Sequence, residues 1–263
     1  MSEPTYLHAT DGAARGRLRL LQLYPRDMNI YGDWGNALVL ARRAQWAGYD
    51  VDLLSYDPGD EFPDDVDLLV GGGGQDSGQR GILSDLMKLK SELPGMIEAG
   101  VPMLVICGLY QLMGHYFQTG DGDRLTGLGI FDAVTVAGQK RLIGNVVVDA
   151  GDELGVLVGY ENHSGRTDLG KEQAPLGRVI KGWGNDGAGK LEGAIRQAAI
   201  GTYLHGPVLA KSPHLADWLL ARASYRRYGE AKLEPADGHA EKELARLERL
   251  SERARQIALT RPQ

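Results

Sequence analysis

Residues 101–111 read VPMLVICGLYQ, and this stretch decides the fold. The run from Val101 to Ile106 is apolar without interruption, as expected of a central strand in a parallel sheet that helices cover on both faces. Cys107 and Gly108 follow at once. Such a strand delivers the next residue to the carboxyl edge of the sheet, where open α/β sheets bind their ligands. The stretch therefore predicts an α/β fold with Cys107 at the functional edge.

The segments before this strand alternate between strand and helix patterns. Short apolar runs predict strands at residues 18–24, 51–56 and 66–70. Apolar residues at helical spacing, followed by a glycine, predict helices at residues 36–48 and 84–99. This alternation indicates an open, mainly parallel sheet flanked by helices.

Residues 126–205 have a different pattern, because short strand-like runs are separated by turn residues. Asn185-Asp186-Gly187 is a hairpin signal, and residues 199–204 form another apolar strand pattern. We therefore expect a β-rich second half within the same α/β fold class.

Residues 213–228 predict a helix, with Ser212 as its N-cap and Gly229 after its end. We expect the main domain to stop there. The predicted organisation has three parts: a polar N-terminal tail at 1–17, the α/β domain at 18–229 and a charged C-terminal helical extension at 230–263.

The C-terminal extension carries seven acidic and seven basic side chains. Its apolar residues fall at helical spacing: Leu244, Leu247, Leu250, Ala254 and Ile257. A charged helix with one narrow apolar stripe packs on its own domain or receives a partner.

Composition excludes several classes of protein. With 29 basic and 35 acidic residues, the net charge of −6 does not suit a nucleic-acid-binding surface. No apolar run approaches the roughly 20 residues that span a bilayer, and the N-terminus lacks the apolar segment of a signal peptide. We therefore expect a cytoplasmic protein with no membrane insertion.

Cofactor motifs give no positive signal. Cys107 is the only cysteine, and the histidines show no metal-ligand spacing, so we expect no metal site. Residues 184–190, GNDGAGK, resemble a phosphate-binding loop, but Leu191 stands where serine or threonine would bind magnesium. We interpret this segment as a hairpin loop and expect no cofactor in this chain.

Cys107 and His205 are the candidate catalytic pair. A lone cysteine is most often buried packing, but a strand-to-helix turn exposes a nucleophile and stabilises its thiolate at the helix N-terminus. His205 ends the strand pattern GTYLHGP at residues 201–207. Two strand ends on one edge of a sheet can bring a nucleophile and its base together.

Gly71-Gly72-Gly73-Gly74-Gln75-Asp76 follows another predicted strand. Consecutive backbone N–H groups in such a loop could hold an oxyanion or a phosphate, although a flexible turn has the same composition. The loop lacks the glycine register of a dinucleotide fold.

Together these features resemble class I glutamine amidotransferases of the CobB/CobQ type, whose fold is flavodoxin-like. Within them the chain is most similar to the GatD family, the glutaminase subunits of lipid II isoglutaminyl synthases. The resemblance covers residues 18–229 and rests on six motifs: NIYGDWGN at 29–36, ICGLYQ at 106–111, GLGI at 127–130, RLIG at 141–144, GYENHSGRT at 159–167 and GTYLHGP at 201–207.

The resemblance implies an enzyme that hydrolyses L-glutamine. Cys107 would be the nucleophile, His205 the general base and acid, and a cysteine thioester the intermediate. Backbone N–H groups at Gly73 and Gly108 would form the oxyanion hole, and Arg141 would bind the substrate glutamine.

The family also implies a partner. A MurT-like subunit of the Mur-ligase family would form a heterodimer with this chain, carry ATP and magnesium, and hold lipid II as the acceptor for ammonia. Peptidoglycan synthesis and cell-wall biogenesis would then be the process served. A corrin precursor is an alternative acceptor, and a cysteine hydrolase that releases no ammonia or a non-catalytic scaffold on the same fold are alternatives to the activity.

One position departs from the broader class. Many class I enzymes carry a glutamate two residues after the histidine, where this chain has Pro207. The carboxylate that orients His205 must then come from elsewhere. The partner is one hypothesis, and Asp33 or Asp76 of this chain is the other.

Overall fold

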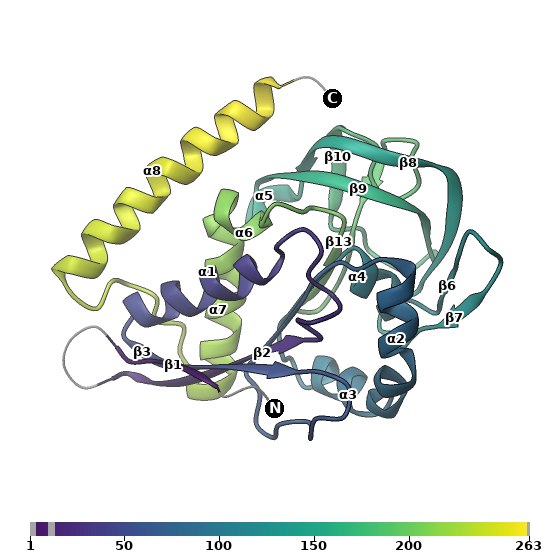
Figure 1. Cartoon of the computed structure of the whole chain (residues 1–263). Helices are drawn as coiled ribbons and strands as arrows, with labels where there is room; N and C mark the ends of the chain where they lie inside the picture. The colour runs from purple at the N-terminus through teal and green to yellow at the C-terminus, as the bar shows by residue number, and fades with distance from the viewer. Residues whose placement is uncertain (1–3, 10–13, 262–263) are drawn as a thin grey trace.

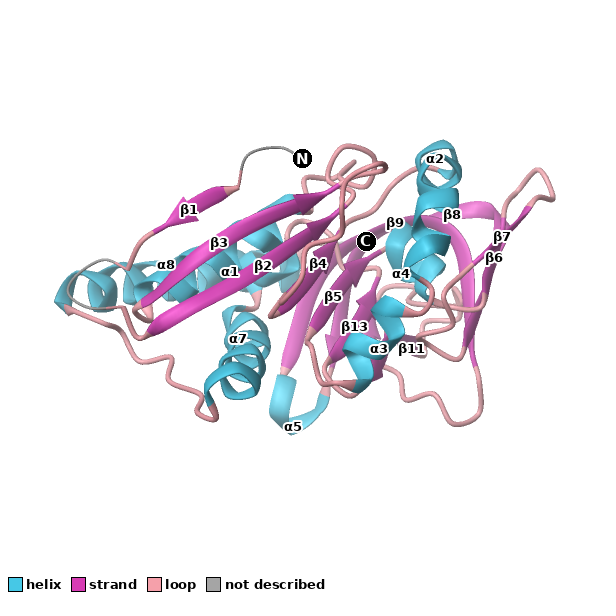
Figure 2. Cartoon of the chain, turned by 90° about the horizontal axis from the view of Figure 1, so that it is seen from below, coloured by secondary structure: helices cyan, strands magenta, loops and turns pink. Residues whose placement is uncertain are grey.

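The computed structural model describes residues 4–9 and 14–261, which form two β-sheets with helices around them (Figure 1). The first sheet has seven strands in the order β1-β3-β2-β4-β5-β13-β12 (Figure 2). Their bounds are β1 Thr5–Leu7, β2 Gly16–Leu23, β3 Tyr49–Tyr56, β4 Leu68–Gly71, β5 Met103–Ile106, β12 Ala194–Arg196 and β13 Ala199–Thr202. The five inner strands are parallel, and the two edge strands β1 and β12 pair antiparallel. The predicted α/β class with a mainly parallel sheet is confirmed.

Most of the β-rich second half forms a separate sheet, which the sequence patterns do not predict. Its strand order is β11-β10-β8-β6-β7, with β9 paired to β8. The bounds are β6 Tyr116–Gln118, β7 Arg124–Thr126, β8 Ala133–Asp149, β9 Val156–Leu169, β10 Gly177–Lys181 and β11 Leu191–Glu192. Residues 182–190 connect the antiparallel strands β10 and β11, in agreement with the predicted hairpin loop.

The helices are α1 Trp34–Trp46, α2 Asp76–Leu86, the 3₁₀ turn η1 Met87–Leu89, α3 Glu92–Glu98, α4 Gly108–Met113, α5 Gly151–Leu154, α6 Val208–Lys211, α7 Pro213–Tyr228 and α8 Gly238–Thr260. Helix α1 packs against β2, β3 and β4 beside α7, and α4 packs against β5 and β13. These helices cover the sheet around the point where β5 ends.

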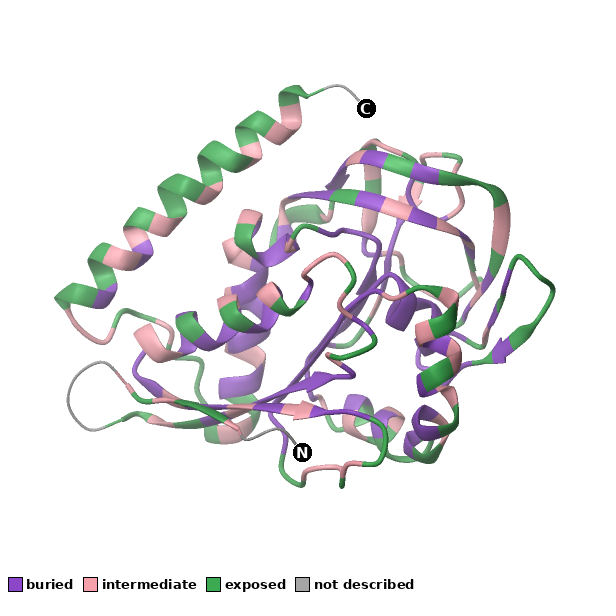
Figure 3. Ribbon diagram, in the orientation of Figure 1, coloured by how far each residue is buried: buried purple, intermediate pink, exposed green. Residues whose placement is uncertain are grey.

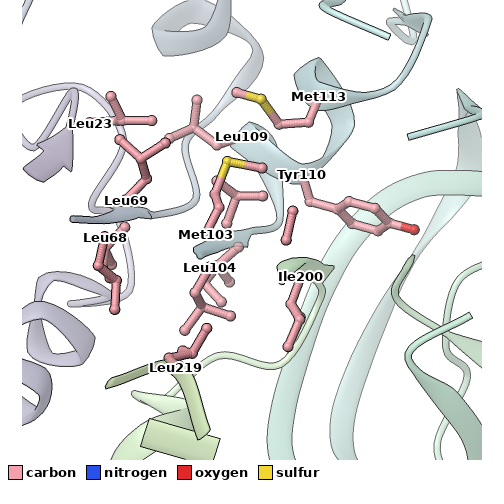
Figure 4. Packing of buried hydrophobic residues seen from close by; sticks show 14 of the residues in the cluster. Leu23, Leu68, Leu69, Met103, Leu104, Leu109, Tyr110, Met113, Ile200 and Leu219 are labelled. Carbon is pink, nitrogen blue, oxygen red and sulfur yellow. The ribbon is translucent and has the colours of Figure 1, made fainter. Parts of the chain in front are cut away.

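The core centres on β5 and its neighbouring strands (Figures 3 and 4). Met103, Leu104 and Ile106 are fully buried. Leu69 on β4 and Ile200 on β13 pack in the same cluster. Truncating a leucine to alanine at such a site lowers the free energy of unfolding by about 2–5 kcal/mol. This tight packing holds β5, and therefore the residue that follows it, in place.

Strand register brings three loops to one edge. Ile106 lies opposite Thr202, and Gly71 lies opposite Val105. Because these strands are parallel, the residues that follow β4, β5 and β13 all leave the sheet at its carboxyl edge. The glycine loop, Cys107 and the segment leading to His205 therefore emerge side by side.

The predicted helix at 84–99 is wrong in its bounds. The structure has α2, η1 and α3 instead, and α2 begins at Asp76, inside the glycine-rich stretch. A continuous helix would place the Pro94 ring against the carbonyl of Lys90, so the chain must break before Pro94.

The predicted polar tail at 1–17 holds two structural elements. Thr5–Leu7 pair antiparallel with β3 as strand β1, and β2 begins at Gly16 rather than residue 18. Residues 1–3 and 10–13 of this predicted tail lie outside the described residues. The sequence patterns do not predict β1, because three residues are too few to show the alternation of a strand. The pairing with β3 is what stabilises this strand.

Helix α7 has the predicted bounds, and Gly229 follows it in the left-handed conformation. Ser212 is the N-cap residue, as predicted, but its side chain makes no hydrogen bond to the helix N-terminus. The apolar strand pattern at 199–204 is shorter in the structure, since β13 ends at Thr202.

Helix α8 confirms the helical reading of the C-terminal extension. Asp237 caps it by accepting hydrogen bonds from the N–H groups of His239 and Ala240. Leu244 is buried, whereas Leu250 and Ile257 are about half exposed, at 49% and 46%. The apolar stripe thus packs on the domain only in its first half. Further along the helix, the Ser251 hydroxyl donates a hydrogen bond of 2.7 Å to the Ala210 carbonyl, and α8 also contacts β8 and β9.

Candidate active site

Cys107 occupies a strained turn between β5 and α4. Its φ of +50° and ψ of −103° lie in a sparsely populated region for a residue with a side chain, and such strain costs about 1–3 kcal/mol. The Cys107 amide donates a hydrogen bond of 2.8 Å to the Thr202 carbonyl on β13. The side chain is buried. The structure thus places Cys107 on a strand-to-helix elbow, as the sequence predicts.

His205 is fixed by backbone bonds between the two sheets. Its N–H donates to the Tyr160 carbonyl at 2.9 Å, and the Tyr160 N–H donates back to the His205 carbonyl at 3.1 Å. The imidazole is 1% exposed and packs edge-on against the Tyr31 ring, with centroids 4.5 Å apart. Its position is therefore set by elements from both halves of the chain.

Asp33 is the carboxylate that contacts His205. The imidazole Nδ1 lies 3.0 Å from Asp33 Oδ2 and 3.1 Å from Oδ1, and Asp33 is 1% exposed at the residue before α1. A carboxylate accepts hydrogen bonds, so Nδ1 carries the proton and Nε2 is the nitrogen left for proton exchange. Asp76, the other acidic candidate, makes no contact with His205 within the described part of the chain.

The charge state of His205 follows from its neighbours. Burial by itself lowers the pKa of the imidazole, but the hydrogen bond to Asp33 and the proximity of Cys107 outweigh it. Together they raise the pKa of His205 to about 10. At neutral pH the imidazole is therefore protonated and can deliver a proton to a leaving group.

Gly73 packs between the side chains of Cys107 and His205. A Cβ atom there would lie 2.8 Å from His205 Cε1 and 3.1 Å from Cys107 Cβ, so only glycine fits. The Gly73 N–H donates to Asp33 Oδ2 at 2.9 Å. The expected role of this N–H in an oxyanion hole does not fit the geometry, because the carboxylate already engages it.

Gly108 opens helix α4. Its N–H is in the first turn, where no carbonyl of the helix can accept a hydrogen bond from it. This N–H is therefore suited to donate a hydrogen bond to an oxyanion. The Gly74 amide nitrogen lies 2.9 Å from the point where a Cβ on Gly108 would stand, so the two backbone groups are neighbours. Gly74 is the glycine-loop residue next to Gly108.

A cavity of about 610 Å³ opens beside Cys107. Its lining includes Tyr31, Asp76, Gln111, Arg141 and Asn162. It is large enough for an amino acid, and Cys107 forms part of its wall.

Arg141 reaches this cavity through an irregularity in the β8–β9 pair. Ala137 lies opposite Gly165 and Leu142 opposite His163, so residues 138–141 bulge away from the ladder. Asn162 holds the guanidinium: Arg141 Nε donates to Asn162 Oδ1 at 2.9 Å, and Nη2 donates to its carbonyl at 2.8 Å. The structure thus brings Arg141 and Cys107 to one cavity.

Glu192 is a buried carboxylate that holds the residues leading to His205. No sequence pattern predicts this role. Glu192 Oε1 accepts hydrogen bonds of 2.6 Å from the Thr202 hydroxyl and from the Tyr203 N–H. It is fully buried, and burial raises its pKa to about 7. Because the Thr202 carbonyl accepts the hydrogen bond of the Cys107 amide, Glu192 fixes the segment that holds Cys107 and leads to His205. No spacing signal marks such a residue, since its partners come from tertiary packing.

A second buried network lies under α4. The Gln79 amide donates to the Gly108 carbonyl at 3.0 Å and to Gln111 Oε1 at 2.9 Å, and the Gln111 amide donates to the Tyr203 hydroxyl at 3.2 Å. These bonds tie α2 to the elbow helix. The ICGLYQ motif contains Gln111, but its role appears only in the folded chain.

Residues 4–9 and 14–261 contain neither a metal-binding cluster nor a membrane-spanning helix. No group of three or more histidine, cysteine, aspartate or glutamate side chains there is placed to hold a metal ion. No helix in these ranges has the length and apolar character needed to cross a membrane.

Comparison with known proteins places the chain among glutamine amidotransferases. The model of the CobB/CobQ-like glutamine amidotransferase domain matches residues 19–213. The subunit GatD of lipid II isoglutaminyl synthase (glutamine-hydrolyzing) from Staphylococcus aureus is 39% identical over 203 residues, which is 76% of this chain and 82% of the relative. The corresponding subunit from Streptococcus pneumoniae is 36% identical and covers 86% of this chain and 88% of the relative.

Other relatives match a shorter region. A probable cobyric acid synthase from Methanopyrus kandleri is 34% identical over 60% of this chain, but the match spans 34% of that protein. Among solved structures, a glutamine amidotransferase from Thermotoga maritima superposes with a TM-score of 0.51 over 92% of this chain and 93% of its own, at 16% identity. Another glutamine amidotransferase structure superposes with a TM-score of 0.54 over 78% of this chain and 98% of its own, at 14% identity. These two structures share the fold.

Proposed function

The chain belongs to the CobB/CobQ-like glutamine amidotransferase family, and on this premise we propose that it is the glutaminase subunit of a lipid II isoglutaminyl synthase. It hydrolyses L-glutamine to glutamate and ammonia and passes the ammonia to a ligase subunit. The observation that carries the glutaminase activity is the buried Asp33–His205 pair beside Cys107 at the wall of a cavity of amino-acid size.

Acylation begins at the thiolate of Cys107. Its sulfur attacks the side-chain amide carbon of glutamine, and the carbonyl oxygen becomes an oxyanion. The Gly108 N–H and the neighbouring Gly74 N–H donate to that oxygen, and each such donor contributes about 2.7–4 kcal/mol in comparable sites. When the intermediate collapses, the C–N bond breaks, the imidazolium of His205 gives its proton to the leaving nitrogen, and ammonia departs.

Deacylation reverses the proton path. Neutral His205 takes a proton from water, which attacks the thioester carbon. The C–S bond then breaks, Cys107 leaves as a thiolate beside the imidazolium, and glutamate is released. Asp33 acts through His205 as a positioning residue, because it fixes the tautomer and stabilises the imidazolium. Arg141 binds the α-carboxylate of glutamine, where its guanidinium can donate two hydrogen bonds.

The ammonia serves a partner of the Mur-ligase type, which is MurT-like and forms a heterodimer with this chain. That subunit binds ATP and magnesium, activates the α-carboxylate of D-glutamate in the lipid II stem peptide and receives the ammonia. Because the ligase step consumes ATP, we assign the reaction to the cytoplasm, as a step of peptidoglycan synthesis.

A second acceptor is a corrin precursor, favoured by the similarity to cobyric acid synthases. Coverage supports the lipid II assignment more strongly. The chain spans 82% and 88% of the two GatD subunits but 34% and 32% of the two cobyric acid synthases.

The deciding experiment measures glutamate and ammonia released from L-glutamine by the purified chain, alone and with a MurT-like ligase subunit. Cys107→Ala is the control, and its thermal unfolding reports whether the fold is retained. We expect release that depends on Cys107 and, with the ligase, ATP-dependent amidation of lipid II. Absence of release under both conditions would support a non-catalytic scaffold, and release of glutamate without lipid II amidation would support another acceptor.

A further inference from the structure

The cavity beside Cys107 presents one full charge of each sign. Among its lining residues, all of which the structure describes, Asp76 is the acidic side chain and Arg141 the basic one. His163 also lines the cavity, but burial lowers its pKa, so it adds no positive charge at neutral pH. Apart from Cys107, the nucleophile of the proposed function, the cavity wall therefore carries one carboxylate and one guanidinium as its charged side chains.

The Asp76 carboxylate is not used by the protein itself. Over residues 4–9 and 14–261 it takes part in no ion pair and no side-chain hydrogen bond, whereas Asp33 engages His205. Asp76 is half-buried at the first position of α2, directly after the glycine loop. A carboxylate in the first helical turn stabilises the helix by about 0.3–1 kcal/mol. That effect explains an acidic residue there but not its place in the wall of the cavity.

The substrate of the proposed function has a matching pair of charges. With its amide carbon at Cys107 and its α-carboxylate at Arg141, L-glutamine must also bring its α-ammonium group into the cavity. A charge removed from water without a partner is strongly unfavourable. The side chain that can compensate an ammonium group in this wall is the Asp76 carboxylate.

We propose that Asp76 binds the α-ammonium group of L-glutamine and thereby makes the cavity specific for an α-amino acid amide. The proposal rests on the proposed glutaminase function. Three fixed points, at Cys107, Arg141 and Asp76, also define the configuration at the α-carbon. Asp76 is thus a specificity-determining residue, distinct from the groups that perform the hydrolysis.

The test compares two substrates on three proteins. L-Glutamine and glutaramate share the amide and the carboxylate, but glutaramate lacks the α-ammonium group. The proteins are the wild type, Asp76→Asn and the matched control Asp27→Asn. Asp27 is an exposed aspartate that lines a neighbouring cavity but not the cavity beside Cys107. The rate of ammonia release gives kcat/KM for each combination of protein and substrate.

We expect Asp76→Asn to lower kcat/KM for L-glutamine by about 10- to 100-fold, mainly through KM, as expected for loss of a hydrogen bond between charged groups. The value for glutaramate should stay within about twofold, so the preference of the wild type for L-glutamine largely disappears. Asp27→Asn should retain that preference. If Asp76 had a purely structural role, Asp76→Asn would lower kcat/KM equally for both substrates, and this result would overturn the proposal. An unchanged preference of Asp76→Asn for L-glutamine over glutaramate would overturn it as well.

Binding measurements separate this proposal from the proposed function. Titration calorimetry on the Cys107→Ala protein compares the affinity for L-glutamine and for glutaramate without turnover. Tighter binding of L-glutamine that depends on Asp76 supports the inference, even if hydrolysis is absent and the glutaminase assignment fails. Equal affinities contradict the inference, even if the wild type is an active glutaminase.

Discussion

Asp33 Oδ2 lies 3.0 Å from His205 Nδ1, although 172 positions separate the two residues in the chain. The same oxygen accepts the N–H of Gly73 from the glycine loop. One buried carboxylate therefore orients the histidine and fixes the loop beside the nucleophile. This chain contains a complete Cys–His–Asp arrangement, so the geometry does not require an orienting carboxylate from a partner.

The first prediction concerns Asp33→Asn. The amide removes the negative charge and can present an N–H to Nδ1, which disturbs the tautomer that leaves Nε2 available. We expect kcat for glutamine hydrolysis to fall by about 10²- to 10⁴-fold with little change in KM. Steady-state kinetics of the chain, alone and with the ligase subunit, measure this. Wild-type kcat in the variant would mean that another carboxylate, for example one on the partner, orients His205.

The second prediction concerns Arg141→Ala. Loss of the guanidinium should raise KM for L-glutamine by about 10- to 100-fold, because a hydrogen bond between charged groups is lost, and should change kcat less. Asn162→Ala, which frees the guanidinium to move, should give a smaller increase. Lys140→Ala is the matched control, since Lys140 is a neighbouring exposed cation outside the cavity wall. Equal KM values for wild type and Arg141→Ala would exclude the substrate-binding role.

The third prediction concerns pH and stability. The pKa of His205 is raised to about 10 in the folded chain, against about 6.5 for an unperturbed histidine. Protonation then favours the folded state fully below pH 6.5, and this contribution is lost as the pH rises from 6.5 through 10. Denaturant unfolding at pH 6, 8 and 10 should show that the free energy of unfolding falls as the pH rises. This fall should be smaller in His205→Gln than in the wild type. Parallel pH profiles for both proteins would show that the His205 pKa is not raised.

The fourth prediction compares two glycine-to-alanine changes. Gly73→Ala places a methyl group 2.8 Å from His205 Cε1, so the imidazole must move away from Cys107, and we expect glutaminase activity to be lost. Gly81, inside α2, has open space where its methyl group would stand. Gly81→Ala should retain activity and stabilise the protein by about 0.5–1 kcal/mol. Full activity in Gly73→Ala would contradict the tight packing of the loop against the catalytic pair.

The placement of Cys107 and His205 at one edge of the sheet is predictable, because a local pattern marks each residue. An apolar strand leads into Cys107, another strand pattern leads to His205, and parallel strands place both at one edge. Asp33 was only one of the candidates, because its contact depends on how residues before α1 fold over the glycine loop. No periodicity encodes that contact.

Other features depended on tertiary structure in a similar way. Arg141 reaches the cavity beside Cys107 from the irregular part of the β8–β9 pair, and such an irregularity has no signature in the hydrophobic pattern. The sequence predicts a loop for the glycine-rich stretch at residues 71–76, but α2 begins at its last residue, Asp76. Helix α2 became predictable only in part, because glycine is unfavourable in helices and tertiary contacts compensate for it.

The parts of the catalytic centre leave the ribosome in a fixed sequence. Asp33, Gly73 and Cys107 are synthesised first, and His205 follows 98 positions after the cysteine as β13 enters the sheet beside β5. Domains form as their chain emerges, N-terminal parts first. With His205 as the proposed proton donor, a nascent chain that stops before β13 contains the thiol without that donor, and we expect it to release no ammonia. Glutamine hydrolysis would then start only on chains that have completed the domain.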